Sequence, residues 1–232
     1  MLFDEDLIKF SQDFLQVAQK NQYTKSFRHH LQHLDKEQLK TQLTDDAHKT
    51  VFWINIYNAF VQSLLKEQPS LYRNLNDFHG RKRIVIAQHK ISLHLIEHSI
   101  IRRTRARWRM SSFEKEFCIE APNPLVHFSL NAACASAPPI DIYTLDQYDE
   151  QLQQVTEAYL QKEAVYMEDK NILMLPKLLQ WYKKDFGGNK GLAEFVQKYQ
   201  LVPQEAKPKL RFQSFDTTIA LNAFLHQIEE TD

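Results

Sequence analysis

A stretch of mixed polar and small residues, PLVHFSLNAACASAPPI at positions 124–140, contains the side chains best suited to chemistry. Its alternation predicts a strand over 127–131 with one polar face, because successive strand residues point to opposite sides. An imidazole, a thiol or hydroxyl, and an amide are the components of acyl transfer: base, nucleophile and orienting group. The candidates are His127, Ser129, Asn131, Cys134 and Ser136. A structural role for the histidine is the alternative.

The segment HLIEH at 94–98 matches the H-x-x-E-H pattern of some zinc peptidases, where two histidines bind zinc and the glutamate is the base. On an α-helix, His94 and His98 would share one face. No third zinc ligand follows at a spacing typical of zinc sites, so His127 would have to provide it from a distant strand. Zinc-dependent hydrolysis through His94 and His98 is therefore one alternative. The other is an ordinary helix in which Glu97 or His98 makes a structural hydrogen bond.

The segment VFWINIYNAFVQSLLKE at 51–67 predicts a central helix that is apolar around most of its circumference. Asn55 and Asn58 interrupt it, and a buried amide without partners costs about 1–3 kcal/mol. Two interpretations remain open. The amides either hold neighbouring loop backbone, or they line the same pocket as His127.

Five arginines crowd the segment 102–109, at the predicted end of the next helix. Such a cluster suits phosphates or an acidic partner. Positive charge at a helix C-terminus is also favourable against the helix dipole, and a solvated helix end accounts for most of the cluster.

Composition narrows the class of protein. The 29 basic and 29 acidic residues balance, so we expect no nucleic-acid partner. Polar interruptions in the apolar runs argue against a membrane span. The acidic N-terminus lacks signal-peptide features, and the two cysteines form no disulfide framework. We therefore expect a cytoplasmic protein, and we assign it no metal and no cofactor.

The elements predict a helix-rich α+β fold around a small antiparallel sheet, with all of 1–232 in a single domain. A helical N-terminal segment (1–47) precedes a central helix from about residue 48 to 66 and a hairpin near 83–91. Helices follow at 92–107, 145–162, 176–185 and 190–199. The last elements are a strand at 210–215 and a closing helix at 217–229.

Several separated segments resemble the Domain of Unknown Function 547 family. The resemblance spans roughly residues 50–222. The matching segments are FWINIYNAFVQSLL (52–65), ISLHLIEHSIIR (91–102), VHFSLNAACASAPPI (126–140), LPKLLQWYKKDFG (175–187) and, more loosely, FQSFDTTIALN (212–222). The resemblance implies an architecture and site positions, but no established reaction.

Carried over by position, the resemblance highlights Trp53, Asn55, Tyr57, Asn58, Glu97, His98, His127, Asn131, Ser136, Pro138, Asp185 and Asp216. Relatives that have cysteines in the third segment usually carry them where this chain has Ala132 and Ala137. If those thiols are reactive in relatives, this chain either is inactive or uses another group. At His94 the family more often has an acidic residue, which weakens the zinc interpretation.

Two main hypotheses follow. The first is a hydrolase or acyl transferase with His127, Glu97 and His98 as catalytic residues. In this hypothesis the substrate-binding residues are Asn55, Asn58, Asn131, Ser136 and Cys134. The second is a non-catalytic binding or scaffold domain in which these polar residues form a structural network. The partner in either case is an unknown small molecule or peptide, and a protein partner is compatible with both.

Overall fold

The protein is described here by a computed structural model that covers residues 6–226. The first part of the chain forms helices α1 (Leu7–Gln19), α2 (Lys25–His33), α3 (Lys36–Gln42), α4 (Asp46–Glu67), α5 (Leu75–Gly80) and α6 (Ser112–Phe117), and strands β1 (Ile84–Ile86) and β2 (His89–Ile91). The second part forms α7 (Tyr148–Glu163), α8 (Lys177–Trp181) and α9 (Gly188–Lys198), and strands β3 (Val165–Met167), β4 (Ile172–Leu175) and β5 (Lys209–Phe212).

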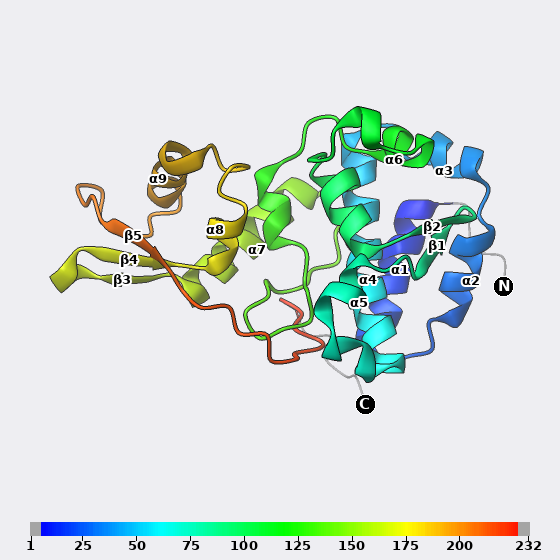
Figure 1. Ribbon diagram of the computed structural model, residues 1–232, viewed down its shortest axis with the longest axis horizontal. Helices are drawn as coiled ribbons and strands as arrows, with labels where there is room; N and C mark the ends of the chain where they lie inside the picture. Colours follow the sequence, from blue (N-terminus) through cyan, green and yellow to red (C-terminus); the bar gives the residue numbers. More distant parts are fainter. Residues whose placement is uncertain (1–5, 227–232) are drawn as a thin grey trace.

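Short helical turns occupy several of the connections. They are 3₁₀ turns at Pro69–Arg73, Arg107–Arg109, Pro124–Phe128 and Glu168–Lys170, and a π-helix at Leu95–Ile101. Figure 1 shows α1–α6 and the β1–β2 hairpin at one end of an elongated molecule, and α9 and β3–β5 at the other. The helix-rich α+β class is confirmed. Within residues 6–226 we find no helix whose length and apolar character would let it cross a membrane.

Helix α4 is the central element, as predicted. Asp45 caps its N-terminus by accepting a hydrogen bond from the backbone N–H of His48 (2.9 Å). Residues on every side of α4 are buried, which follows from its nearly continuous apolar sequence. Helix α1 packs along it, and the rings of Phe14 and Phe60 meet edge to face with centroids 5.3 Å apart. Within the described part of the predicted N-terminal segment, residues 6–47, the chain forms α1, α2 and α3 before it enters α4.

The predicted hairpin is also confirmed, with Ile84 paired to Ile91 across β1 and β2. The helix that follows is shorter than expected. Ser92 accepts a hydrogen bond from the N–H of Leu95 (3.2 Å), as a cap should. The chain then forms a π-helix, which ends with the N–H of Arg102 bonded to the carbonyl of Glu97 (2.9 Å). Arg103, with φ +49°, turns the backbone away from helical geometry.

The expected strand over 127–131 is wrong. Residues Pro124–Phe128 form a 3₁₀ turn instead. Pro124 has the fixed φ that suits a first helical position, and the Asn123 side chain accepts from the N–H of Leu125 (2.9 Å). These local signals outweigh a polar–apolar alternation only five residues long.

The expectation of one antiparallel sheet also needs correction. The β1–β2 hairpin is separate from a second sheet of order β3-β4-β5, in which β3–β4 is antiparallel and β4–β5 is parallel. The predicted last strand corresponds to β5. No helix forms over 217–226, and residues 227–229 of the predicted closing helix lie outside the described residues.

Residues 213–226, which we call the C-terminal segment, run back from β5 toward the helical end of the molecule (Figure 1). This segment lies against the small-residue turn at 132–140. Backbone hydrogen bonds join Ala135 to Thr218 (2.9 Å), Ala220 to Ala133 (2.9 Å) and Leu225 to Ile140 (2.8 Å). The small side chains of the turn allow this close backbone approach.

Candidate functional site

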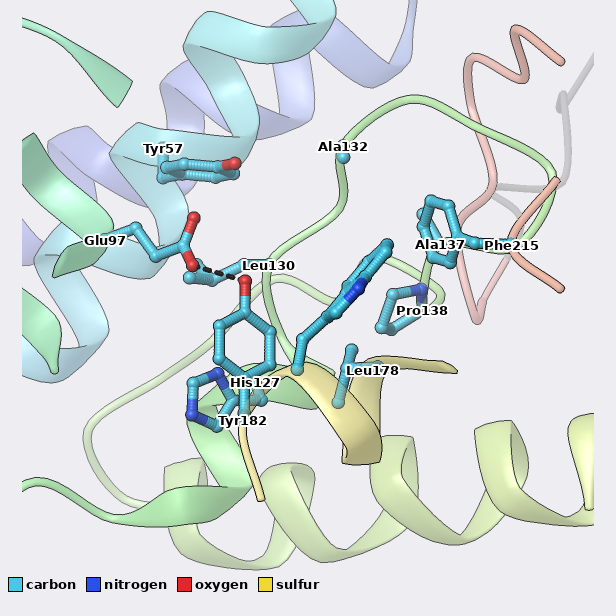
Figure 2. A pocket seen from close by; sticks show the side chains of 11 residues that line it. Tyr57, Glu97, His127, Leu130, Ala132, Ala137, Pro138, Leu178, Tyr182 and Phe215 are labelled. Carbon is cyan, nitrogen blue, oxygen red and sulfur yellow. Dashed lines mark hydrogen bonds between the residues drawn. The ribbon is translucent and has the colours of Figure 1, made fainter. Parts of the chain in front are cut away.

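A hollow of about 430 Å³, including its open mouth, lies between α4, the π-helix, the turn at 132–140 and α8. Figure 2 shows its lining at close range. The wall is mostly aromatic and aliphatic, with one carboxylate and one imidazole. The lining residues are Tyr57, Glu97, His127, Leu130, Ala132, Ala137, Pro138, Leu178, Trp181, Tyr182 and Phe215.

Asp185 joins two of the polar groups beside the hollow. Its Oδ2 accepts hydrogen bonds from Nε2 of His127 (2.8 Å) and Nε of Arg102 (2.9 Å). Because a carboxylate only accepts, Nε2 of His127 carries the proton and Nδ1 is the unprotonated nitrogen. Arg102 also donates from Nη1 to Nδ1 of His98 (2.6 Å). One largely buried guanidinium, that of Arg102, therefore links His98 to the Asp185–His127 pair.

Glu97 is the carboxylate of the hollow. It is only 8% exposed, and its Oε1 accepts a hydrogen bond from the Tyr182 hydroxyl (2.6 Å). Figure 2 shows this bond beside the ring of Tyr57. The nearest guanidinium nitrogen, on Arg102, is 3.9 Å away. The Tyr182 ring stacks on His127 (centroids 3.8 Å apart) and lies beneath the Arg102 guanidinium (4.4 Å).

Burial sets the protonation of the two histidines, and hydrogen bonds set that of Asp185. It lowers the pKa of His127 to about 4, although the hydrogen bond to Asp185 opposes that change. It likewise lowers the pKa of His98. For Asp185 burial would raise the pKa, but the hydrogen bonds from His127 and Arg102 outweigh it and the pKa falls. Near neutral pH both imidazoles are therefore neutral, and Asp185 is ionised.

Local structure explains how these side chains meet. The π-helix places Glu97, His98 and Arg102 around one point, which is a common use of π-helical turns at functional sites. The turn after α8 provides Tyr182 and Asp185. It is closed by the hydrogen bond from the N–H of Asp185 to the carbonyl of Tyr182 (2.8 Å).

Three of the predicted substrate-binding residues make backbone contacts instead of lining the hollow. Asn55 donates to the carbonyl of Tyr143 (2.9 Å) and accepts from its N–H (3.0 Å). Asn58 donates to the carbonyl of Ser129 (2.8 Å) and accepts from the N–H of Asn131 (3.0 Å). The Asn131 side chain donates to the carbonyl of Pro138 (2.6 Å). These contacts match the structural interpretation of the amides.

The remaining two predicted substrate-binding residues, Ser136 and Cys134, contact the C-terminal segment. Ser136 Oγ accepts from the N–H of Asp216 (2.9 Å). Cys134 is buried opposite Ile219, and burial raises the pKa of its thiol to about 11. A thiol that stays protonated is a poor nucleophile. Neither residue lines the hollow.

The predicted catalytic residues are brought close together. His127 and Glu97 both line the hollow, with Tyr182 between them. Nδ1 of His98 lies 3.5 Å from Oε1 of Glu97, and Arg102 links His98 to the Asp185–His127 pair. Ser129, the other hydroxyl of the expected polar face, donates to the carbonyl of Val126 (2.8 Å) and is fully buried.

The zinc interpretation finds no geometric support. The ring centroids of His94, directly before the π-helix, and His98, within it, lie 5.2 Å apart, and Nδ1 of His98 accepts from Arg102. Within the part of the chain that the structure describes, no three histidine, cysteine or acidic side chains are arranged to hold a metal ion.

The arginine cluster divides into Arg102, whose side chain is 11% exposed, and the remaining members, whose side chains are half-buried or exposed. Arg102 belongs to the site, which corrects its interpretation as part of a solvated helix end. Arg103 pairs with Glu120 (2.8 Å) and Arg105 with Glu114 (2.9 Å). Arg109 lies over the ring of Trp108 (4.5 Å).

Sequence reasoning missed part of the wall of the hollow and one residue beside it. The missed wall residues are Leu130, Leu178, Trp181, Tyr182 and Phe215, and the neighbouring residue is Arg102. The segment LPKLLQWYKKDFG had drawn attention through the family resemblance, which highlighted Asp185. Nothing in its pattern, however, shows that Tyr182 would reach Glu97.

The fold and the hollow define a helix-rich α+β protein with a mostly aromatic and aliphatic hollow that contains one carboxylate and one imidazole. The sequence model of the family described as "Protein of unknown function, DUF547" matches residues 40–160, just over half of the chain. The chain belongs to this family, as the resemblance indicated. Comparisons with curated proteins and with solved structures gave no match.

Proposed function

We propose that this protein is a binding domain whose hollow receives a small molecule or a protruding side chain of a partner. The observation that carries this proposal is the composition of the wall. Among the described residues, no cysteine, serine, threonine or lysine lines the hollow, whereas aromatic rings and a buried carboxylate do. A concave wall of mainly apolar and aromatic side chains with a few polar groups is typical of ligand sites.

The alanines of the turn support binding over covalent catalysis. Ala132 and Ala137 both line the hollow, so this chain lacks thiols at the two positions where the family resemblance implies them in relatives. The remaining cysteine nearby, Cys134, is buried and protonated. A covalent acyl-enzyme therefore has no evident nucleophile here.

Ligand-observed NMR tests the binding function. The purified chain is titrated with three probes: phenol, tetramethylammonium and acetate. We expect at least one to bind, and Ala132→Phe, which fills the hollow, to abolish that binding. Ala193→Phe, on the exposed face of α9, is the matched control. The proposal fails if no probe binds, or if binding is the same in the Ala132→Phe variant.

A second candidate is a hydrolase that activates water, using His127 with Glu97 and His98 nearby. The His127–Asp185 hydrogen bond (2.8 Å) favours it, because an oriented imidazole is the usual general base. The lowered pKa of about 4 makes His127 a weak base near neutral pH. Hydrolysis of p-nitrophenyl acetate above the buffer rate, lost in His127→Gln, would support this candidate over simple binding. Equal rates for both proteins would reject it.

A further inference from the structure

The aromatic wall of the hollow comes from separate parts of the chain. Tyr57 belongs to α4, Trp181 ends α8, and Phe215 lies in the C-terminal segment. The rings of Trp181 and Phe215 are in contact, with centroids 4.7 Å apart. Trp181 is 54% exposed, which is unusual for so large an apolar side chain in contact with a pocket. The ring of Tyr182 is already in contact with His127 and Arg102, so the other three rings remain for a ligand.

The charges around the hollow do not balance. Glu97 and Asp185 provide two carboxylates against one guanidinium, that of Arg102, while burial keeps His127 and His98 neutral. Arg102 is committed to Asp185, since its Nε and Nη2 both lie 2.9 Å from Oδ2 of that residue. Glu97 is therefore left with a hydrogen bond from Tyr182, a guanidinium at 3.9 Å and, at 3.5 Å, Nδ1 of His98, which accepts from Arg102 and so has no proton to donate to Glu97. A buried carboxylate so weakly compensated favours a positive ligand.

The rest of the wall restricts the kind of cation. A primary ammonium needs several hydrogen-bond acceptors when it leaves water. The hollow offers the Glu97 carboxylate and otherwise mainly apolar side chains. Those apolar residues are Leu130, Ala132, Ala137, Pro138 and Leu178. An ammonium whose hydrogens are replaced by alkyl groups has no such need, and its positive charge is attracted to aromatic faces.

Building on the binding function proposed above, we propose that the hollow binds an alkylated ammonium group. Glu97 provides the counter-charge, and the rings of Tyr57, Trp181 and Phe215 surround the alkyl groups. Figure 2 shows Glu97 and Tyr57 on one side of the hollow and Pro138 and Phe215 on the other.

Two probes of equal shape test the proposal. Choline and 3,3-dimethylbutan-1-ol differ in having a charged nitrogen or a neutral carbon at the centre of three methyl groups. Isothermal titration of the full chain should show choline binding at least about tenfold more tightly than the neutral alcohol. Glu97→Gln, which keeps an oxygen for the Tyr182 hydroxyl, should weaken choline binding about tenfold and leave the alcohol unchanged.

Matched variants keep the test independent of folding. Trp181→Ala removes a half-exposed ring and should weaken choline about tenfold, whereas Trp108→Ala, 77% exposed and outside the hollow, should not. Glu194→Gln on α9 is the control for Glu97→Gln. If Glu97→Gln does not fold, two other results test the proposal: the comparison of choline with 3,3-dimethylbutan-1-ol, and choline binding by Trp181→Ala.

The proposal is overturned if the neutral alcohol binds as tightly as choline. It is also overturned if folded Glu97→Gln and Trp181→Ala both bind choline like the unchanged protein. In that case the general binding function still stands if the protein binds the alcohol or phenol and Ala132→Phe abolishes that binding.

A further titration distinguishes two sources of the alkylated ammonium group. A short peptide with trimethyl-lysine that binds more tightly than choline indicates a partner protein, and the reverse order indicates a free small molecule.

Discussion

His127 is the residue at which burial most changes the chemistry. It is 3% exposed, stacks on Tyr182 and donates to Asp185. In the unfolded chain the same imidazole has a pKa near 6.5, whereas in the folded protein burial lowers the pKa to about 4. The difference couples the protonation of His127 to the stability of the fold.

We predict a loss of stability in mild acid. Between about pH 6.5 and pH 4 the unfolded chain takes up a proton at this residue and the folded protein does not. The free energy of unfolding should therefore fall with decreasing pH by up to about 3 kcal/mol from His127 alone. His98 and His79, whose pKa values burial also lowers, add to the effect. Urea denaturation across this pH range measures it.

His127→Gln keeps a donor for Asp185 and cannot titrate, so its stability should depend less steeply on pH. His29→Gln, at an exposed position of α2, should keep the original slope. If the free energy of unfolding depends on pH equally steeply in the unchanged protein and in His127→Gln, folding does not lower the pKa of His127.

Helix α4 organises the loops around the hollow through two side-chain amides. An asparagine amide has one donor and one acceptor group like those of a peptide bond. Asn55 and Asn58 use these groups to hold both the carbonyl and the N–H of a distant loop, at 143 and at 129–131 respectively. The loop that carries His127 is thus fixed to the central helix directly after the 3₁₀ turn.

Asn58→Ala should lower the free energy of unfolding by about 3 kcal/mol, because it leaves the carbonyl of Ser129 and the N–H of Asn131 buried without a partner. Denaturation in urea gives the value. Asn189→Ala, at an exposed position in α9, should change stability by less than about 0.5 kcal/mol. A small effect of Asn58→Ala would mean that water or a rearranged loop satisfies those backbone groups.

The C-terminal segment connects the two ends of the molecule. It leaves β5 beside β4, adds Phe215 to the hollow and then pairs with the turn at 132–140. Figure 1 shows it, in orange and red, crossing from the strand-rich end toward the helices. The prediction of a single domain is still untested, and this segment gives it a physical basis, since separating the two ends would break its hydrogen bonds.

Hydrogen exchange should reveal this connection. The amides of Ala135, Ile140, Ala220 and Leu225 donate to backbone carbonyls across the pairing, so we expect them to exchange slowly and at similar rates. The amide of Gln204, in an exposed turn, is the reference for fast exchange. Fast exchange at all four amides would indicate that the C-terminal segment detaches readily and that the two ends unfold separately.

Much of the fold follows from local sequence. The apolar pattern of α4, the hairpin flanked by isoleucines and the capping residues Asp45 and Ser92 are signals within a few residues, and the structure agrees with them. The predictions that were wrong concern segments where local sequence signals compete or are weak. The polar alternation at 127–131 was too short to outweigh Pro124 and Asn123, and the apolar strands β3 and β4 gave no distinct signal.

By itself, the sequence determined the helix-rich class, the central helix, the family and the candidate residues His127 and Glu97. Only the tertiary structure decided which groups surround the hollow. His127 is hydrogen-bonded to Asp185, 58 positions away in the sequence, and Glu97 to Tyr182, 85 positions away. Periodicity and capping act over a few residues, whereas these contacts depend on how α4, α8 and the C-terminal segment pack. For that reason the asparagines that looked like binding residues hold backbone, and Trp181 and Phe215, which looked ordinary, line the hollow.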